Sequence, residues 1–474
     1  MIGSRVFYVC GVKAFVERLG IQMKVQKTMT EGSIWRNILF FSIPLILGNL
    51  FQQLYNTMDS IIVGNYIGSE ALAAVGSSGS IINVLISFCV GASTGAGVVI
   101  SQFFGAKDKE GVRKAVHTTI AISIGAGLVI SVVGVVTSPM ILKAMGTPSE
   151  VFDSAVTYLQ IFFGGILFSV IYNMSAGILN AAGNSKRSLV YLIIAAVSNI
   201  FLDLLFVVVF KMGIVGAALA TDVSQFLSWV FIIAFLARSQ DIYKLNFKDI
   251  RLYDNLFSKI LKIGLPTGVQ NIVISLSNVV VQSSVNSFGA MAMAGFAAYI
   301  KVDGFNILPV MSFSMAATTF AGQNVGAQKY DRVKKGMHVS VRMGVCYTIL
   351  TGILLMQFAP QVIGVFTDQT EFVEYGVFIM KFFCPFYWML AILHVIAGII
   401  KGTGKTMQAM FVFLFSLCLF RVFWIWGALR ITHELFSVVT AYPVSWCVGM
   451  VMIVLYVWKG KWMPKGYYET VKEK

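Results

Sequence analysis

Charged residues are scarce in this sequence. They make up 12% of the 474 residues, whereas hydrophobic residues make up 57% and the mean hydropathy is +0.80. Soluble domains carry about a quarter charged residues, so this composition excludes an ordinary soluble protein and predicts an integral membrane protein. The length of the chain then sets the number of membrane spans rather than a number of soluble domains.

Histidine and cysteine are also few. The four histidines and six cysteines are scattered, with no CxxC pair and no spacing typical of metal ligands. We therefore expect no metal site and no disulfide framework, and we interpret the cysteines as small buried hydrophobic residues. The segment 401–406 resembles a phosphate-binding loop, but Ile399 stands where its first glycine is required. The sequence thus indicates neither an ATPase nor any other enzyme.

Twelve apolar runs predict an all-α, multi-pass protein of the cell (inner) membrane. A helix rises 1.5 Å per residue, so about 20 residues cross about 30 Å of hydrocarbon. Pro44, Pro266, Pro309 and Pro385 lie within these runs, where a proline removes a backbone hydrogen bond and interrupts or bends a helix. The predicted spans are 37–63, 73–102, 115–138, 153–181, 187–210, 214–237, 258–284, 293–321, 337–358, 372–400, 406–429 and 436–458.

Basic residues outnumber acidic residues by 36 to 21. No basic stripe interleaves with aromatic residues, so we expect no nucleic-acid partner. Lysine and arginine instead gather in every second loop, whereas the alternate loops hold only Lys143, Lys211 and Arg430. By the positive-inside rule, both termini and the central linker are cytoplasmic.

The two halves of the chain repeat each other. Six spans per half is an even number, so both halves enter the membrane from the same side, which predicts two pseudo-symmetric six-helix bundles around a central cleft. The predicted parts are a cytoplasmic N-terminal segment 1–36, a first lobe 37–237, a cytoplasmic linker 238–257, a second lobe 258–458 and a cytoplasmic tail 459–474. The first segment is either an amphipathic lead-in or an extension before a start at Met29. Residues that recur at a shift of 221 or 222 include Pro44 and Pro266, Gln102 and Gln323, Gly105 and Gly326, and His117 and His338.

Acidic residues lie inside the spans of the first half, and one of them, Asp222 beside Thr221 in the sixth span, has an ambiguous role. Asp59 stands in the first span, and Asn199 and Asp203 stand four residues apart in the fifth, on one helix face. A carboxylate at this depth costs several kcal/mol and is a functional residue by default. The repeat equivalents of Asp59 and Asp203 are Val280 or Val281 and Trp424. This asymmetry predicts a cation-coupling site in the first bundle.

The residues of this site could bind either of two cations, H⁺ or Na⁺. Burial and mutual repulsion favour a carboxyl group that binds a proton, whereas carboxylate, amide and hydroxyl oxygens together suit Na⁺. A third interpretation makes the acids neutral, hydrogen-bonded spacers.

Other polar residues are candidates for the cleft. Gln52, Tyr55 and Asn56 share the span of Asp59, and Lys301 and Asp303 lie in the eighth span. These two residues could line the cavity of the second bundle and contact substrate, or form an interior ion pair with an unidentified partner, or Lys301 could snorkel near the helix end.

Short motifs resemble those of the multidrug and toxic compound extrusion (MATE) family, and within it the DinF-like prokaryotic branch. They are Pro44 with Tyr55-Asn-Thr-Met-Asp59 and Val63-Gly64, Gly105-Ala-Lys107, Ala181-Ala-Gly-Asn184, Gly264-Leu-Pro266 and Gly322-Gln-Asn-Val-Gly-Ala327. The resemblance covers residues 37–460.

The resemblance implies a V-shaped pair of lobes and a proton site in the first lobe. Its matched positions are Asp59, Asn199, Asp203, Tyr158 and Thr221. The NorM-like branch instead has an acid on the seventh span, and this chain has none between Pro266 and Ser287.

The sequence therefore predicts a monomeric secondary antiporter in the lipid bilayer. It would export small amphipathic or cationic molecules in exchange for H⁺ or Na⁺ by alternating access, with no cofactor. The alternative is a flippase for lipid-linked precursors, which would need a cluster of basic side chains facing the cleft.

Overall fold

The computed structural model describes residues 28–365, 370–432 and 434–472. Within these ranges the regular secondary structure is entirely helical, and twelve segments are long and apolar enough to cross a membrane. Most of the predicted N-terminal segment, residues 1–27, lies outside the described residues, as do the last two residues of the tail.

The first half of the chain forms six spans. These are α2 (Ile34–Tyr66), α3 (Ser69–Gly105), α4 (Lys109–Ala144), α5 (Ser149–Ala181), α6 (Ser185–Asp203) continued by the π-helix η1 (Leu204–Val209), and α7 (Gly213–Arg238).

The second half begins after a linker that contains a short 3₁₀-helix, η2 (Phe247–Asp249). Its elements are α8 (Asp254–Asn286), α9 (Ala290–Gly326), α10 (Tyr330–Gln357), α11 (Ala359–Gly364), α12 (Thr370–Phe383), η3 (Cys384–Phe386), α13 (Tyr387–Gly402), α14 (Thr406–Phe413), the π-helix η4 (Leu414–Phe420), α15 (Arg421–Ile431), α16 (Leu435–Val439), α17 (Ala441–Lys459) and α18 (Lys465–Lys472).

All twelve predicted spans are confirmed, and most are longer than predicted. Proline interrupts only the tenth, where Pro385 lies in the 3₁₀ segment between α12 and α13. Pro44, Pro266 and Pro309 lie inside continuous helices, so these prolines do not end their spans, and bending at them stays a prediction. Neighbouring helices can satisfy the backbone groups that a membrane proline frees.

The interpretation of the cysteines as buried residues holds for Cys89 and Cys384 but is wrong for Cys346, which is exposed. A membrane face tolerates a small apolar side chain, because the surrounding lipid is itself apolar.

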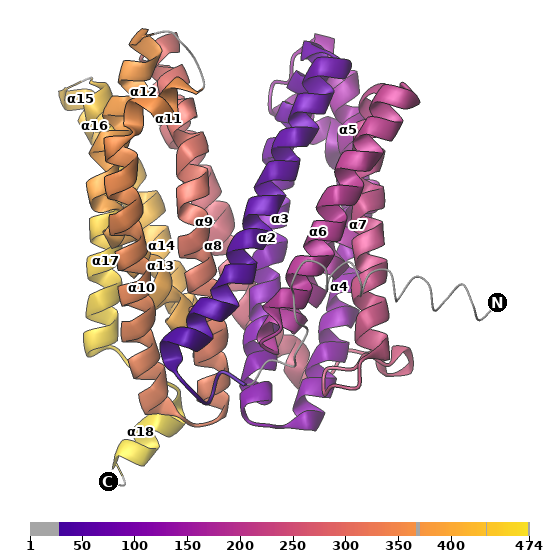
Figure 1. Cartoon of the computed structure of the whole chain (residues 1–474), viewed down its shortest axis with the longest axis vertical. Coiled ribbons are helices and arrows are strands. Elements are labelled where there is room, and N and C mark those ends of the chain that lie inside the picture. The colour runs from indigo at the N-terminus through magenta and orange to yellow at the C-terminus, as the bar shows by residue number, and fades with distance from the viewer. Residues whose placement is uncertain (1–27, 366–369, 433, 473–474) are drawn as a thin grey trace.

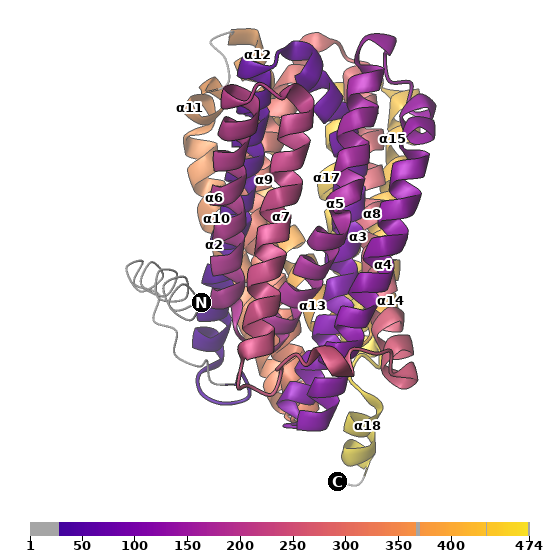
Figure 2. The ribbon, with the colours of Figure 1, turned by 90° about the vertical axis from the view of Figure 1, so that its right-hand side faces the viewer.

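The spans form two bundles, α2–α7 and α8–α17 (Figure 1). The bundles approach each other at the end of the molecule near α18 and diverge towards the end that carries α11 and α12. Figure 2, turned by 90°, shows that the long helices run along one common direction.

The first helix of each half begins in the hydrophobic core of the opposite bundle. Ile38 and Phe41, near the start of α2, belong to the core of the second bundle, whereas Ile260 and Ile263, near the start of α8, belong to the core of the first. The rest of α2 then runs alongside the first bundle (Figure 1). The two crossed helices join the bundles at one end, and this crossing follows the internal repeat.

Glycines allow the crossing. Gly91 and Gly95 on α3 lie so close to the backbone of Gly268 and Gly264 on α8 that neither position has room for a Cβ atom. Small residues permit this close approach between membrane helices.

The segment before α2 is held against the second bundle. The Met29 amide donates to Gln323 Oε1 at 2.9 Å, and Lys329 Nζ donates to the Thr30 carbonyl at 2.9 Å. Arg332 donates to the carbonyls of Glu31 and Gly32 at 3.0 and 2.8 Å. These contacts fix the start of α2 at the end where the bundles meet.

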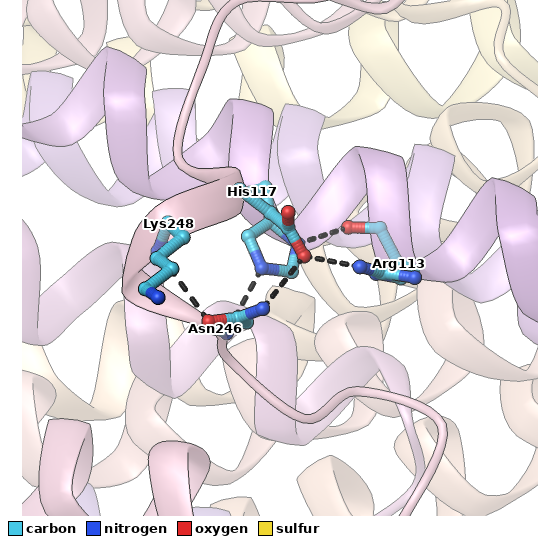
Figure 3. Close-up of polar contacts among 5 residues, drawn as sticks. Arg113, His117, Asn246 and Lys248 are labelled. Atoms are coloured by element: carbon cyan, nitrogen blue, oxygen red, sulfur yellow. Dashed lines mark hydrogen bonds and ion pairs between the residues drawn. The ribbon is translucent and has the colours of Figure 1, made fainter.

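The linker is attached to α4 (Figure 3). The Asn246 amide donates to His117 Nε2 at 3.0 Å, so the ring proton lies on Nδ1, which donates to the Arg113 carbonyl at 2.7 Å. The Arg113 side chain forms an ion pair with Asp249, and this contact lowers the pKa of the Asp249 carboxyl group. Asn246 Nδ2 also donates to Asp249, at 3.0 Å.

Candidate functional site

Asp59 on α2 and Asp203 at the end of α6 face each other within hydrogen-bonding reach. Asp203 is fully buried and Asp59 is half-buried. Asp59 Oδ1 and both carboxylate oxygens of Asp203 are buried without a donor among the described residues. Two ionised carboxylates can only accept hydrogen bonds, so the pair is held together only when a proton or a metal cation lies between them.

Tyr158 on α5 belongs to the same cluster. Its buried side chain belongs to the same hydrophobic cluster as Ile62 and Val63 of α2, and its hydroxyl is within electrostatic range of both acids. Its position beside the two carboxyls places a potential hydrogen-bond donor next to the pair.

Asn199 lies one turn before Asp203 on α6. The residue is 1% exposed, and neither its amide nitrogen nor its amide oxygen has a hydrogen-bond partner among the described residues. An unpaired buried polar group costs about 1–3 kcal/mol, so this amide is poised to gain from a bound ion or water.

Thr221 is less closely tied to the acids. Its hydroxyl donates to the Ala217 carbonyl of its own helix at 3.3 Å. The structure shows no hydrogen bond from it to Asp59 or Asp203, so its assignment to the site stays a prediction.

Asp222 is a further acid near the cluster, and the sequence alone left its role open. Its carboxyl lies directly against Gly165 on α5, where a Cβ would clash, and within electrostatic range of Tyr158. A lone acid in a membrane span was the only signal available for it.

The helix that carries Asn199 and Asp203 changes its winding at the site. The α-helix ends at Asp203 and the π-helix η1 begins at Leu204. Single π-helical turns are frequent at functional sites. The apolar sequence Leu-Leu-Phe-Val-Val-Val gives no signal for this change.

An uncharged cavity of about 160 Å³, lined by apolar and polar side chains, lies between α2, α3, α5, α6 and α9. It is large enough for several water molecules but smaller than the roughly 300 Å³ that drug-sized ligands need. Gln52, one of the predicted cleft residues, lines this cavity, and its contact with substrate stays a prediction. Its polar lining residues are Asn49, Gln52, Ser93, Thr94, Ser101, Tyr172, Asn173, Asn180, Ser188, Thr318 and Thr319.

Tyr55 connects this cavity to the acids. Its hydroxyl lies near Gln52 and within electrostatic range of both Asp59 and the cavity residue Tyr172. Tyr55 thus stands between the polar cavity and the Asp59–Asp203 pair.

The remaining cleft candidates are placed differently. Asn56 and Lys301 are exposed. Asp303 Oδ1 accepts a hydrogen bond from the Tyr387 hydroxyl at 2.6 Å, and that hydroxyl lies 2.8 Å from the hydroxyl of Tyr299. The acid of the eighth span is therefore held by tyrosines, which the sequence did not predict.

The comparison with known proteins adds independent findings. A model of the MatE family matches residues 44–205 and 266–426, once in each bundle. The chain is 28% identical over 457 residues to the probable multidrug resistance protein YoeA of Bacillus subtilis, covering 92% of this chain and 97% of YoeA. It is 23% identical over 376 residues to the multidrug export protein MepA of Staphylococcus aureus, covering 79% and 83%.

Solved structures share the fold. An outward-facing multidrug resistance MATE transporter of the MOP superfamily superposes with a TM-score of 0.86 at 23% identity, covering 91% of this chain and 97% of that one. A MOP superfamily transporter from Pyrococcus furiosus gives a TM-score of 0.85, also at 23% identity, with the same coverage.

Proposed function

The chain belongs to the MatE family, and from this premise we propose that it is a secondary antiporter that exports small amphipathic or cationic drugs in exchange for H⁺ or Na⁺. Family membership makes it a multi-pass membrane transporter of small molecules rather than an enzyme. The names of YoeA and MepA, a probable multidrug resistance protein and a multidrug export protein, support drug-like cargo.

The observation that carries the proposal is the facing pair Asp59 and Asp203, with its unpartnered oxygens. Two like charges about 4 Å apart repel by about 4 kcal/mol at an effective dielectric constant of 20. A proton or Na⁺ between the carboxyls removes this repulsion. The pair therefore binds a cation when the carboxyls are close together and releases it when they separate or become hydrated.

The crossing of α2 supports a coupling between this site and the bundles. The first turns of α2 lie in the core of the second bundle, while Asp59, further along, faces Asp203 of the first. A change in the packing of the bundles therefore moves Asp59 relative to Asp203. Cation and drug then drive exchange by preferring different arrangements of the bundles.

The repulsion between the two carboxylates is comparable in size to the free energy that coupled exchange requires. Shifting a two-state equilibrium from 1:99 to 99:1 requires a differential affinity of about 5.5 kcal/mol. Relief of the carboxylate repulsion supplies a few kcal/mol, and the drug supplies the remainder by binding the opposite state.

We further propose that the termini are cytoplasmic and the protein lies in the cell membrane. The basic residues concentrated in one set of loops support this orientation. The bundles diverge at the end away from α18 (Figure 1). In this orientation that end faces outwards.

The flippase alternative has less support. A pyrophosphate head group requires several converging basic side chains. The two basic candidates in the spans of the second half are not alike, because Lys301 is exposed and Arg421 is buried.

Transport into proteoliposomes tests the proposal. Ethidium flux under an imposed pH gradient, measured with and without Na⁺, should depend on one of the two cations and should be lost in Asp59→Asn. Asp153→Asn makes the same chemical change at an exposed residue and should transport normally. Undiminished flux in Asp59→Asn would refute the assigned role of the acid.

A further inference from the structure

The lipid-exposed side of α10 carries basic residues. Lys335, His338 and Arg342 are exposed, and their spacing of three and four residues places them on one face of the helix. The same face continues with the exposed apolar residues Ile349 and Ile353. Because residues that suit the lipid interior follow directly, the basic residues lie where α10 crosses the membrane surface.

Arg342 lies below the membrane boundary that the sequence predicts. The predicted span begins at residue 337, and at a rise of 1.5 Å per residue Arg342 lies about 8 Å inside it. The equivalent residue of the first half, at a shift of 221, is Ala121. An arginine that faces lipid at this depth extends its guanidinium towards the membrane surface, where phosphate groups are the available anions.

The equivalents of Lys335 and His338 in the first half have partners within the protein. Lys114 forms an ion pair with Glu110 one turn earlier on α4. His117 accepts a hydrogen bond from the linker, which lies against this part of α4 (Figure 3). A segment of the chain therefore occupies the equivalent surface in the first half.

On α10 this surface is open. The tail follows the last span as the linker follows the sixth, and it contacts α10 through a hydrogen bond between Tyr467 and Lys334. Among the described residues, no ion pair or side-chain hydrogen bond involves Lys335, His338 or Arg342. The three basic side chains are thus available to a ligand outside the chain.

The start of α2 borders the same surface. Leu39 packs against the core of the second bundle, whereas Gly48 lies against Leu192 of the first. Trp35, one turn before Leu39, therefore lies on the flank of α2 that faces α10. Its ring is exposed, and the Arg36 guanidinium carbon lies 5.3 Å from the ring centre.

The starts of α2 and α10 lie side by side at one level (Figure 1). Arg332 on α10 donates to the carbonyl of Glu31, just before α2, at 3.0 Å. From this shared level both helices run in the same direction, so Arg36 is close to the level of Lys335. The two helices together present what we call the basic face, which consists of Arg36, Lys335, His338 and Arg342.

We propose that the basic face binds the head group of an anionic phospholipid in the cytoplasmic leaflet. Guanidinium and ammonium groups bind phosphate through charge-assisted hydrogen bonds, and basic side chains at this side of membrane helices recognise anionic head groups. Trp35 suits the interface, and the exposed Phe40 and Ile43 on α2 lie along the acyl chains. The acids Glu31 and Asp331 lie at the helix starts, farther from the bilayer. The proposal depends on the orientation proposed above.

Quenching of Trp35 fluorescence by brominated lipids tests the proposal. The protein is reconstituted into an equal mixture of phosphatidylglycerol and phosphatidylcholine, with bromine on the acyl chains of either one, so that the composition is constant. The Trp35 signal is the difference between each protein and the same protein with Trp35→Phe. Brominated phosphatidylglycerol should quench this signal more strongly, with a binding preference of about fivefold or more, the size expected for one basic residue at the surface.

Substitutions on α10 should remove this preference. Arg342→Ala gives α10 the residue that stands at the equivalent Ala121, so the protein should fold normally and lose most of the preference. Lys335→Gln combined with Arg342→Ala should lose all of it, whereas Arg342→Lys should retain much of it. Lys109→Gln combined with Lys262→Gln also removes two exposed cations at this end of the molecule, and should bind phosphatidylglycerol like the wild type.

Three outcomes would overturn the proposal. The first is equal quenching by the two lipids in the wild type, and the second is a preference that survives Lys335→Gln with Arg342→Ala. The third is a wild-type dimer that Arg342→Ala converts to a monomer, because a second copy of the chain would then cover the face. The measurement needs no transport, so a lipid preference in a protein that exports no ethidium would contradict the proposed function alone.

Discussion

Gln102 and Gln323 make the same hydrogen bond in opposite directions between the two bundles. Gln102 Nε2 on α3 donates to the Gly402 carbonyl of the second bundle at 3.1 Å, and Gln323 Nε2 on α9 donates to the Ala181 carbonyl of the first at 2.9 Å. The two pairs of residues are related by the 221-residue repeat. The bundles are thus joined by a reciprocal pair of bonds at the end where they meet.

Removing either glutamine should favour separation of the bundles at that end. A hydrogen bond contributes about 1 kcal/mol net, so Gln102→Ala or Gln323→Ala should shift the equilibrium roughly fivefold, and the double variant further. Thiol labelling of a Thr319→Cys reporter in the polar cavity measures the opening. Gln160→Ala, which removes a comparable bond to Val135 inside one bundle, should leave the labelling rate unchanged. An unchanged rate in the double variant would show that these bonds do not hold the bundles closed.

The glycine crossing of α3 and α8 should not tolerate a methyl group. Gly95→Ala puts a Cβ into the backbone of Gly264, and overpacking of this kind costs about 1–3 kcal/mol. We expect a lower unfolding temperature in detergent for Gly95→Ala. Gly79→Ala, on the same helix but with open space around it, is the control and should unfold like the wild type. A Gly95→Ala protein as stable as wild type would mean that the helices can separate there without cost.

Substitution of Asn199 distinguishes a structural role of this residue from a functional role. Its amide has no hydrogen-bond partner in the part of the chain that the structure describes, so Asn199→Ala should leave the thermal stability unchanged or raise it, because an unpaired buried polar group is removed. Transport of ethidium should nevertheless fall at least tenfold, if the amide binds the coupling cation or its water. Full transport by a stable Asn199→Ala protein would exclude Asn199 from the site.

The linker should not contribute to the pH dependence of transport. Arg113 lowers the pKa of Asp249, so Asp249 stays ionised at neutral pH. The stability from this ion pair is present above the unfolded pKa of about 4 and is lost only as the pH falls through the lower folded value. The pH profile of ethidium transport between pH 6 and 8 should therefore be the same in Asp249→Asn as in wild type. A shifted profile in this variant would show that the linker contributes to the pH dependence of transport.

The sequence predicted those features that depend on composition and spacing along one helix. The twelve spans belong to this class. The meeting of Asp59 with Asp203 joins two helices, and the sequence indicated it only through the rule that an intramembrane acid faces a polar interior. The π-helices η1 and η4 could not be predicted, since their apolar sequences suit an α-helix equally well. The tyrosine partners of Asp303 were also missed, because Tyr387 lies more than eighty residues away and only tertiary packing joins them.

The exchange of one cation for one drug at Asp59 is the central claim. Wild-type proteoliposomes loaded with ethidium and the pH dye pyranine, with no imposed pH gradient, should show proton movement opposite to the ethidium flux, or Na⁺ movement if Na⁺ is the partner. Asp59→Asn should abolish this cation movement, and Asp153→Asn should preserve it. Cation movement of wild-type size in Asp59→Asn would contradict the account.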